Sequence, residues 1–251
     1  MHRTLFLNLA ILFIATGQSR GNDATEAKAL LDRAIKAAGG EAVLAKFKAA
    51  RFKSKGILYV GDEKVSLTSD WTYQRFDQLR STVVLEKSDG KRLEITEVVN
   101  GDRGWLKVNN DPTEEVGKDY FQARKEQMYS NWIMRLIPLT AKEIGLTLLP
   151  ETTVGDRPAV GLEATHPDHH SVKLWFDKES ALVIKIAERI KDPETGKEVN
   201  QEIMFASFKE VQGRRVAHRA VYFRDGKKKG EEEITEVTLS ERVDDNLFTK
   251  P

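Results

Sequence analysis

The chain has no cysteine among its 251 residues. This absence excludes disulfide bonds, a thiol nucleophile and a thiolate metal site. It also excludes the lipid-bearing cysteine by which bacterial lipoproteins are anchored, so an exported form of this protein would diffuse freely in its compartment. A chain without thiols is compatible with an oxidising compartment.

Neither sign of charge is in excess, with 40 lysine and arginine residues against 39 acidic ones and a formal net charge of +1. Arg3 is the only charged side chain among residues 1–17, so removal of that segment would leave +1 − 1 = 0. A protein of this balance has no electrostatic reason to bind nucleic acid or an anionic membrane. We therefore expect no nucleic-acid partner.

Long apolar stretches are also missing, and the N-terminal run at residues 5–15 falls short of the roughly 20 residues that a membrane-spanning helix needs. His2 and Arg3 precede this run, and Ala15 and Gly17 follow with the small-x-small spacing of a signal-peptidase site. We expect residues 1–17 to be a cleaved signal peptide. The mature protein would then be exported to the periplasm, soluble and not membrane-spanning.

Catalytic motifs are absent too: the sequence has no G-x-S-x-G elbow and no glycine-rich phosphate loop. We expect no enzyme and no cofactor. A cluster of His166, Asp168, His169 and His170 could ligate zinc, but it lacks the H-E-x-x-H spacing and falls where a hairpin turn is expected. Of the two alternatives, a metal site and a solvated loop, we favour the loop and predict no metal.

The chain does contain stretches in which apolar side chains recur at every second position. In residues 171–190, Val172, Leu174 and Phe176 alternate with polar or exposed neighbours, then a turn at 177–180 leads into a second alternating arm. Similar stretches lie at 49–59, 65–73, 80–86, 92–100, 105–108, 146–150, 159–165, 200–208, 215–223 and 231–241, followed by a tail at 246–251. The pattern predicts a curved antiparallel sheet of roughly ten strands, with the charged run 227–233 as a solvated hairpin tip that protects a sheet edge or, alternatively, a docking surface.

Two segments follow helical spacing instead. Residues 23–38 have a helical apolar stripe and end at Gly39-Gly40, with a short second helix expected at 41–47. Residues 118–138 form an amphipathic helix inserted between two sets of strands. Residues 23–251 suit one domain in size, so we predict a mainly β, α+β half-barrel with an N-terminal helical segment and an inserted lid helix.

An ordered set of motifs resembles the LolA-like family of periplasmic lipoprotein carriers and lipid-binding half-barrels. The motifs are the leader, LLDRAIKAAGG, WTYQRFDQLR, NGDRGW, MYSNWIMRLIPL, LWFDKESALVIK and DDNLFTKP. The resemblance implies a monomeric carrier or binding protein for lipoproteins or other acylated ligands, with membrane-bound donor and acceptor proteins as candidate partners. The alternative is an envelope-stress sensor or scaffolding domain that uses the same fold to bind lipid or a protein partner.

The resemblance also implies a site. The expected ligand-binding residues lie on the concave sheet face and the lid: Leu67, Trp71, Tyr73, Met128, Trp132, Leu136, Leu174, Phe176 and Ile184. For the aromatic members the alternative is an ordinary core position. In the carriers an arginine on an early strand holds the lid, and Arg80 matches that position here. We therefore expect Arg80 to be the lid latch.

Overall fold

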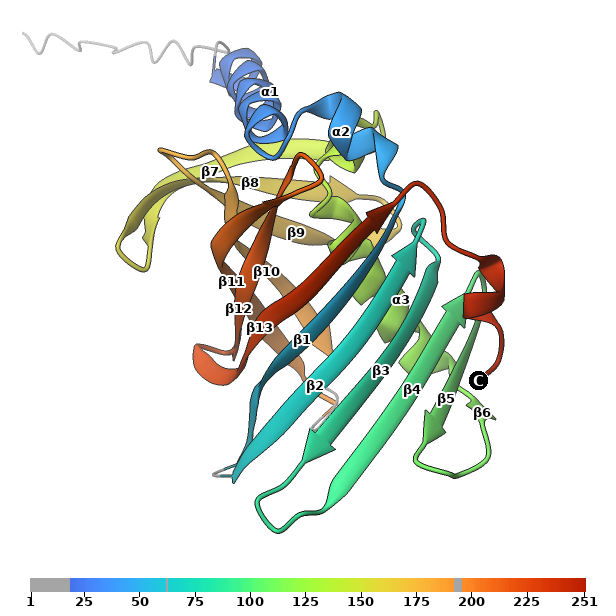
Figure 1. Ribbon diagram of the computed structural model, residues 1–251. Helices are drawn as coiled ribbons and strands as arrows, with labels where there is room; N and C mark the ends of the chain where they lie inside the picture. The colour runs from blue at the N-terminus through green and yellow to red at the C-terminus, as the bar shows by residue number, and fades with distance from the viewer. Residues whose placement is uncertain (1–18, 62, 192–195) are drawn as a thin grey trace, which may run out of the picture.

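A single antiparallel sheet wraps around one helix in the computed structural model, which describes residues 19–61, 63–191 and 196–251 (Figure 1). The expected signal peptide, residues 1–17, lies outside the described residues. The prediction of a mainly β, curved antiparallel architecture is confirmed. The predicted count of about ten strands was too low, because the described residues form thirteen. One of them, β6, has two residues, too few for alternation to show in a sequence.

The strands belong to two consecutive meanders. The first comprises β1 (Ala49–Val60), β2 (Glu63–Gln74), β3 (Gln78–Glu86), β4 (Arg92–Asn100), β5 (Arg103–Val108) and β6 (Glu114–Glu115). The second comprises β7 (Gly145–Val154), β8 (Arg157–His166), β9 (His169–Asp177), β10 (Val183–Lys191), β11 (Glu198–Val211), β12 (Arg214–Arg224) and β13 (Lys227–Ser240). Each strand pairs with its sequence neighbour inside its own meander.

The two meanders join through β1 and β13, the first and last strands of the chain (Figure 1). Their ladder runs from Ala49 opposite Ser240 to Leu58 opposite Gly230. The spatial order is therefore β6-β5-β4-β3-β2-β1-β13-β12-β11-β10-β9-β8-β7. The charged run at residues 227–233 lies in β13, between β1 and β12, so the interpretation of a hairpin tip guarding an edge was wrong.

The N-terminal helices α1 (Ser19–Ala37) and α2 (Glu41–Lys46) lie at one end of the sheet (Figure 1). Gly39, between them, has φ +132°, and a Cβ there would lie 2.4 Å from the carbonyl oxygen of Gly213. Only glycine fits so close an approach. The backbone N–H of Arg215 donates to the carbonyl of Ala38 at 2.9 Å, so the end of α1 is joined to the turn between β11 and β12.

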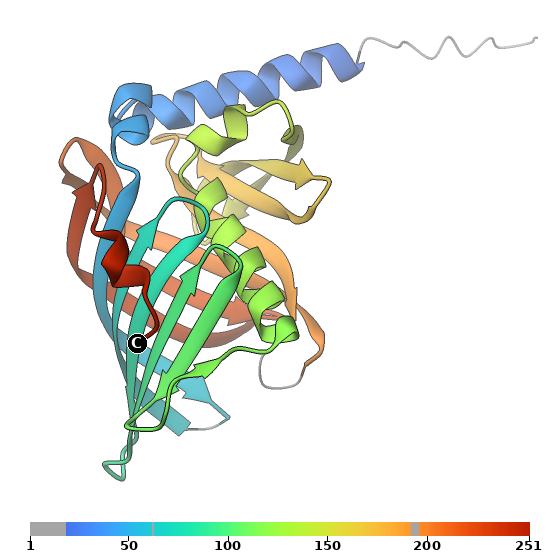
Figure 2. The ribbon, with the colours of Figure 1, turned by 90° about the vertical axis from the view of Figure 1, so that its right-hand side faces the viewer.

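Helix α3 (Lys118–Ile133) is the predicted insertion, and it lies along the concave side of the sheet (Figure 2). It ends at Ile133 rather than at Pro138, because Leu136 takes a left-handed φ of 68° and a 3-10 helix, η1 (Ile137–Thr140), follows. The buried side of α3 presents Met128, Tyr129, Ser130 and Ile133. None of the described helices combines the length and apolarity needed to cross a membrane.

The C-terminal tail does not add a strand. It forms a 3-10 helix, η2 (Asp245–Phe248), against β3 and β4. Phe248 is fully buried and packs with Val98 and Trp105. One buried aromatic side chain thus ties the tail to the sheet, apart from the main core beneath α1 and α3.

Candidate ligand-binding site

A cavity of about 330 Å³ lies between the concave face of the sheet and α3. Its apolar wall comes from six strands and the inserted segment. It includes Phe52 on β1, Trp71 and Tyr73 on β2, Val183 on β10, Ile203 and Phe205 on β11, Tyr222 on β12, Ile234 on β13, and Met128, Trp132 and Leu136 on or just after α3. The rings of Trp71 and Tyr73 are nearly parallel, with centroids 6.1 Å apart. The volume falls within the range of small-molecule sites, roughly 300–1,000 Å³.

Five of the residues expected to bind a ligand line this cavity: Trp71, Tyr73, Met128, Trp132 and Leu136. The other four are not among its lining residues: Leu67, Leu174, Phe176 and Ile184. Leu174 and Phe176 are fully buried in the main core, which also includes residues of α1 and α3. They belong to the core that packs against the cavity wall.

Ile184 shows why alternation alone misplaces a residue. The ladder between β9 and β10 shifts register between Val183 and Lys185. A bulge of this kind moves the following residues to the opposite side of the strand. Val183 therefore lines the cavity, whereas Ile184 packs in a separate cluster with Val154 and Ala159.

Polar contacts hold α3 to the sheet near its first turns. The guanidinium of Arg124 on α3 pairs with the carboxylate of Glu97 on β4 at 2.7 Å, and the Glu97 side chain is 3% exposed. Burial would lower the pKa of Arg124, but the interactions with Glu97 and Tyr120 together outweigh burial and raise that pKa. The Arg124 guanidinium therefore stays protonated in a nearly enclosed contact.

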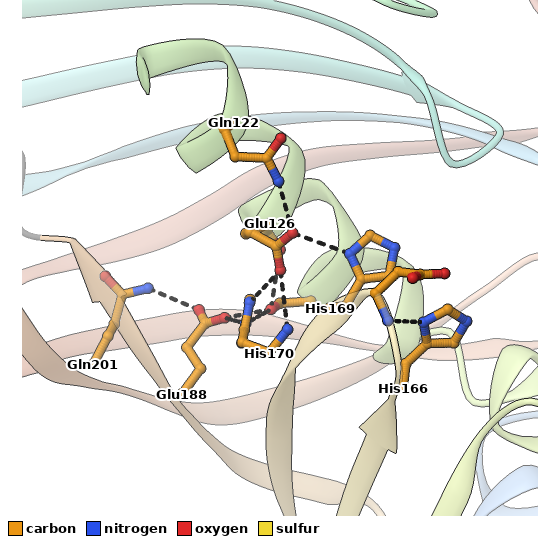
Figure 3. Close-up of polar contacts among 9 residues, drawn as sticks. Gln122, Glu126, His166, His169, His170, Glu188 and Gln201 are labelled. Carbon is orange, nitrogen blue, oxygen red and sulfur yellow. Dashed lines mark hydrogen bonds and ion pairs between the residues drawn. The ribbon is translucent and has the colours of Figure 1, made fainter. Parts of the chain in front are cut away.

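A second attachment involves the histidines of the sequence cluster (Figure 3). Glu126 on α3 contacts His169 Nδ1 at 3.1 Å and His170 Nδ1 at 2.6 Å. The Nε2 atom of His170 contacts Glu188 on β10 at 2.8 Å. Glu188 also accepts hydrogen bonds from Ser130 on α3 and, at 3.0 Å, from Gln201 on β11. This polar network joins α3 to β9, β10 and β11.

The geometry determines the charge of His170. Each of its ring nitrogens faces a carboxylate oxygen, and only the imidazolium has a donor on both nitrogens. Burial would lower the pKa of His170, but its hydrogen bonds to Glu126 and Glu188 raise it to about 9. Burial would likewise raise the pKa of Glu126, which the hydrogen bonds from His170 and His169 instead lower to about 2. His170 is therefore a partly buried cation between two carboxylates.

The expected solvated turn is present at Pro167 and Asp168, which are exposed, but the prediction was wrong for His169 and His170. The side chains of His169 and His170 are 17% and 19% exposed, and the ring of His169 stacks on Tyr129 with centroids 4.1 Å apart. Among the described residues, no three His, Asp or Glu side chains are placed to hold a metal ion. The cluster serves packing and charge pairing between helix and sheet.

A third attachment lies at the end of the inserted segment. Arg135 donates to the backbone carbonyls of Phe47 and, at 3.2 Å, of Lys48. Phe47 is the C-terminal cap of α2, and carbonyls at a helix C-terminus lack partners and carry partial negative charge. Arg135 thus joins the inserted segment to the end of α2.

Arg80 itself does not touch the inserted helix. Its neighbour Leu79 is buried beside Met128, and successive side chains of a strand point to opposite faces, so Arg80 points away from the cavity. The Arg80 guanidinium donates to the carbonyl of Leu247 in η2 at 3.3 Å. The expectation that Arg80 is the lid latch is therefore corrected.

Several residues of the site were missed in the sequence. Glu126, Ser130 and Glu188 carry no motif, and their partners on other elements lie 13 to 58 positions away. Phe205, by contrast, lies in a predicted strand with clear alternation and could have been proposed from its neighbours. Arg135 ends an apolar helical stretch, which is a weak signal for a polar attachment.

The sequence matches no protein-family model and no protein in a search of curated sequences. Solved structures do match. A DUF1329 family protein from Desulfovibrio piger superposes with a TM-score of 0.59 at 13% identity, covering 89% of this chain and 97% of that one. A LolA superfamily protein from Nitrosomonas europaea gives a TM-score of 0.55 at 13% identity, with the same coverage of 89% and 97%.

A third match is the putative outer membrane lipoprotein-sorting protein domain from Vibrio parahaemolyticus. It has a TM-score of 0.53 and 13% identity, covering 88% of this chain and 97% of its own. Identities this low carry information about the fold rather than the activity. Together with the curved sheet around a single inserted helix, these likenesses show that the chain has the LolA-like fold.

Proposed function

We propose that the protein is an exported, periplasmic carrier or binding protein for lipoproteins or other acylated ligands, which it holds in the cavity beneath α3. The observation that carries the proposal is the cavity itself, whose wall of aromatic and aliphatic side chains lies between sheet and helix. Burial of one methylene group in such surroundings contributes about 0.8 kcal/mol, so an acyl chain gains affinity with length. The similar domain described as lipoprotein-sorting supports the same ligand class.

The inserted helix would act as the lid. It is attached by Arg124 to Glu97, by Glu126 and Ser130 to the histidine network, and by Arg135, which follows it, to the end of α2. Polar attachments can exchange for water when a helix lifts, whereas the buried apolar side chains of α3 resist complete separation. The proposal involves binding without catalysis, by a monomer, with membrane-bound donors and acceptors as partners.

The experiment is native mass spectrometry of the protein purified from the envelope of its own cell. Acyl-bearing species that co-purify in a defined stoichiometry support the carrier. A stoichiometric protein partner in place of lipid would favour the alternative, a sensor or scaffolding domain. A second measurement tests the cavity directly, because affinity for a series of n-alkanols should rise about fourfold per methylene until the cavity is full. A flat series would contradict the proposal.

A further inference from the structure

The cavity is apolar in its walls and positively charged in its polar lining. Six basic side chains line it and one acidic side chain does: the basic residues are Lys48, Arg75, Arg135, Arg214, Arg215 and Arg219, and the acidic residue is Glu232. Two of the cations have carboxylate partners, Arg75 with Asp77 at 3.3 Å and Arg219 with Glu231 at 2.8 Å. The remaining charge is not balanced within the cavity.

Arg135 and Arg214 stand out among these cations. Neither forms an ion pair with any carboxylate in the part of the chain that the structure describes. Arg135 donates to the backbone carbonyls of Phe47 and Lys48, which carry no formal charge. Burial, and repulsion by the nearby charge of Arg135, lower the pKa of Arg214 to about 10, so both guanidiniums are protonated at neutral pH. Two like charges therefore share one end of the cavity without a counter-ion from the described chain.

The position of Arg214 is set by the backbone. It is the first residue of β12, directly after the turn in which Gln212 and Gly213 have φ of 50° and 81°. That turn is held against the end of α1 by the close approach of Gly39 to Gly213. The Arg214 side chain is thus attached next to a tightly held turn.

The single acidic lining residue is too far along the sheet to neutralise this end. Glu232 pairs in register with Ala220, six positions along β12 from Arg214, which is about 20 Å at roughly 3.3 Å per residue. Glu232 also accepts a hydrogen bond from Ser54. Uncompensated charge beside an apolar wall is costly, and an anion that entered beside Arg214 and Arg135 would offset that cost.

We propose that the ligand is an amphiphile with an anionic head group, a carboxylate or a phosphate ester, which Arg214 and Arg135 bind while the acyl chain occupies the apolar part of the cavity. The planar guanidinium fork matches the paired oxygens of both head groups. This inference rests on the proposed function, because it names the class of acyl ligand that the same cavity takes.

The test compares three probes of equal chain length: hexadecanoate, hexadecyl phosphate and hexadecanol. Binding measured at pH 8 with each probe below its solubility or micelle limit should show at least one anionic probe binding tenfold or more tightly than hexadecanol. Arg214→Gln should reduce that preference to threefold or less. Added salt should weaken the anionic probes selectively, as screening predicts.

Arg92→Gln is the matched control, because Arg92 is a 60%-exposed strand residue that pairs with Glu94 and does not line the cavity. It removes the same charge and should keep the full preference. Equal binding of all three probes by the parent would overturn the anionic head group while the acyl carrier stands. A preference that survives Arg214→Gln would overturn the role of Arg214, and failure of all three probes to bind would overturn the proposed function itself. The parent comparison decides the head group even if Arg214→Gln does not fold.

Discussion

His170 and Glu188 form an ion pair, with 2.8 Å between Nε2 and the carboxylate, at the point where α3 packs on the sheet. The Glu188 side chain is 2% exposed, and the other ring nitrogen of His170 lies 2.6 Å from Glu126 on the helix. One protonated ring therefore links the helix that covers the cavity to the strand beneath it. The strength of the contact between α3 and the sheet therefore depends on the charge of the His170 ring.

The first prediction concerns pH. The pKa of His170 is about 9 in the folded protein against an ordinary 6.5, so its stabilising contribution is complete below pH 6.5 and is lost as pH rises through 9. The free energy of unfolding should fall across this window, by on the order of 3 kcal/mol. Glu126, with a pKa of about 2 against 4.5, acts in the opposite sense and loses its contribution as pH falls below 4.5 towards 2.

Denaturant unfolding at half-unit steps from pH 6 to pH 10 measures the alkaline change. His170→Gln should remove most of the slope. His166→Gln serves as the control, because His166 accepts a hydrogen bond from the N–H of Asp168 and packs its ring near Tyr129 and His169, but bonds to neither Glu126 nor Glu188. Equal slopes in the parent and His170→Gln would show that the network does not titrate as argued.

The second prediction reverses what the sequence suggested for the histidine cluster. His170→Ala should destabilise the protein by about 3–5 kcal/mol, because it leaves the buried carboxylate of Glu188 without its cation. Adding Glu188→Gln should recover part of the loss, since a neutral amide can still bond with Ser130 and Gln201. Urea midpoints of the single and double variants supply the comparison. A loss below about 0.5 kcal/mol in His170→Ala would restore the solvated-loop interpretation.

The third prediction concerns the end of the inserted segment. Arg135→Leu removes two donors to the α2 terminus while keeping apolar bulk, so stability should drop by about 1.5–3 kcal/mol, the scale of charged hydrogen bonds. Hydrogen exchange at the last turn of α3, residues 130–133, should become faster. Arg80→Leu, which affects only an outward contact with Leu247, should change stability by no more than about 0.5 kcal/mol. Equal losses of stability in Arg135→Leu and Arg80→Leu would contradict the assignment of the attachment to Arg135.

The fourth prediction separates lid from core on one helix. Trp132 is half-buried and lines the cavity, whereas Tyr129, three residues before it, is 1% exposed in the main core. Tyr129→Ala should cost about 3–5 kcal/mol of stability, as large aromatic deletions do. Trp132→Ala should cost less and weaken the binding of a 16-carbon alcohol measurably. Core-like destabilisation by Trp132→Ala with unaltered binding would make Trp132 an ordinary core residue.

Local sequence patterns were enough to predict much of the secondary structure. Alternation of apolar side chains located the strands on both sides of the insertion, and helical spacing located α1 and α3 within a few residues. Five of the nine expected cavity residues, such as Trp71 and Trp132, also line the cavity. Large apolar side chains are mostly buried, and those on the inner face of a curved sheet or on its covering helix are buried in the space between them. These features depend on neighbours within one or two turns of chain.

By itself, then, the sequence determined the type and order of the elements, whereas tertiary structure decided how distant ones meet. The pairing of Ala49 with Ser240 joins the two meanders between residues 240 − 49 = 191 positions apart, and no local period encodes it. The bulge after Val183 exchanged Ile184 for its neighbour at the cavity wall. Likewise, His170 became a cation between two carboxylates, and Arg214 a cation without a carboxylate partner, only when packing brought other charges near or kept them away. Charge and burial depend on surroundings assembled from remote segments, so they follow from the folded arrangement rather than from spacing along the chain.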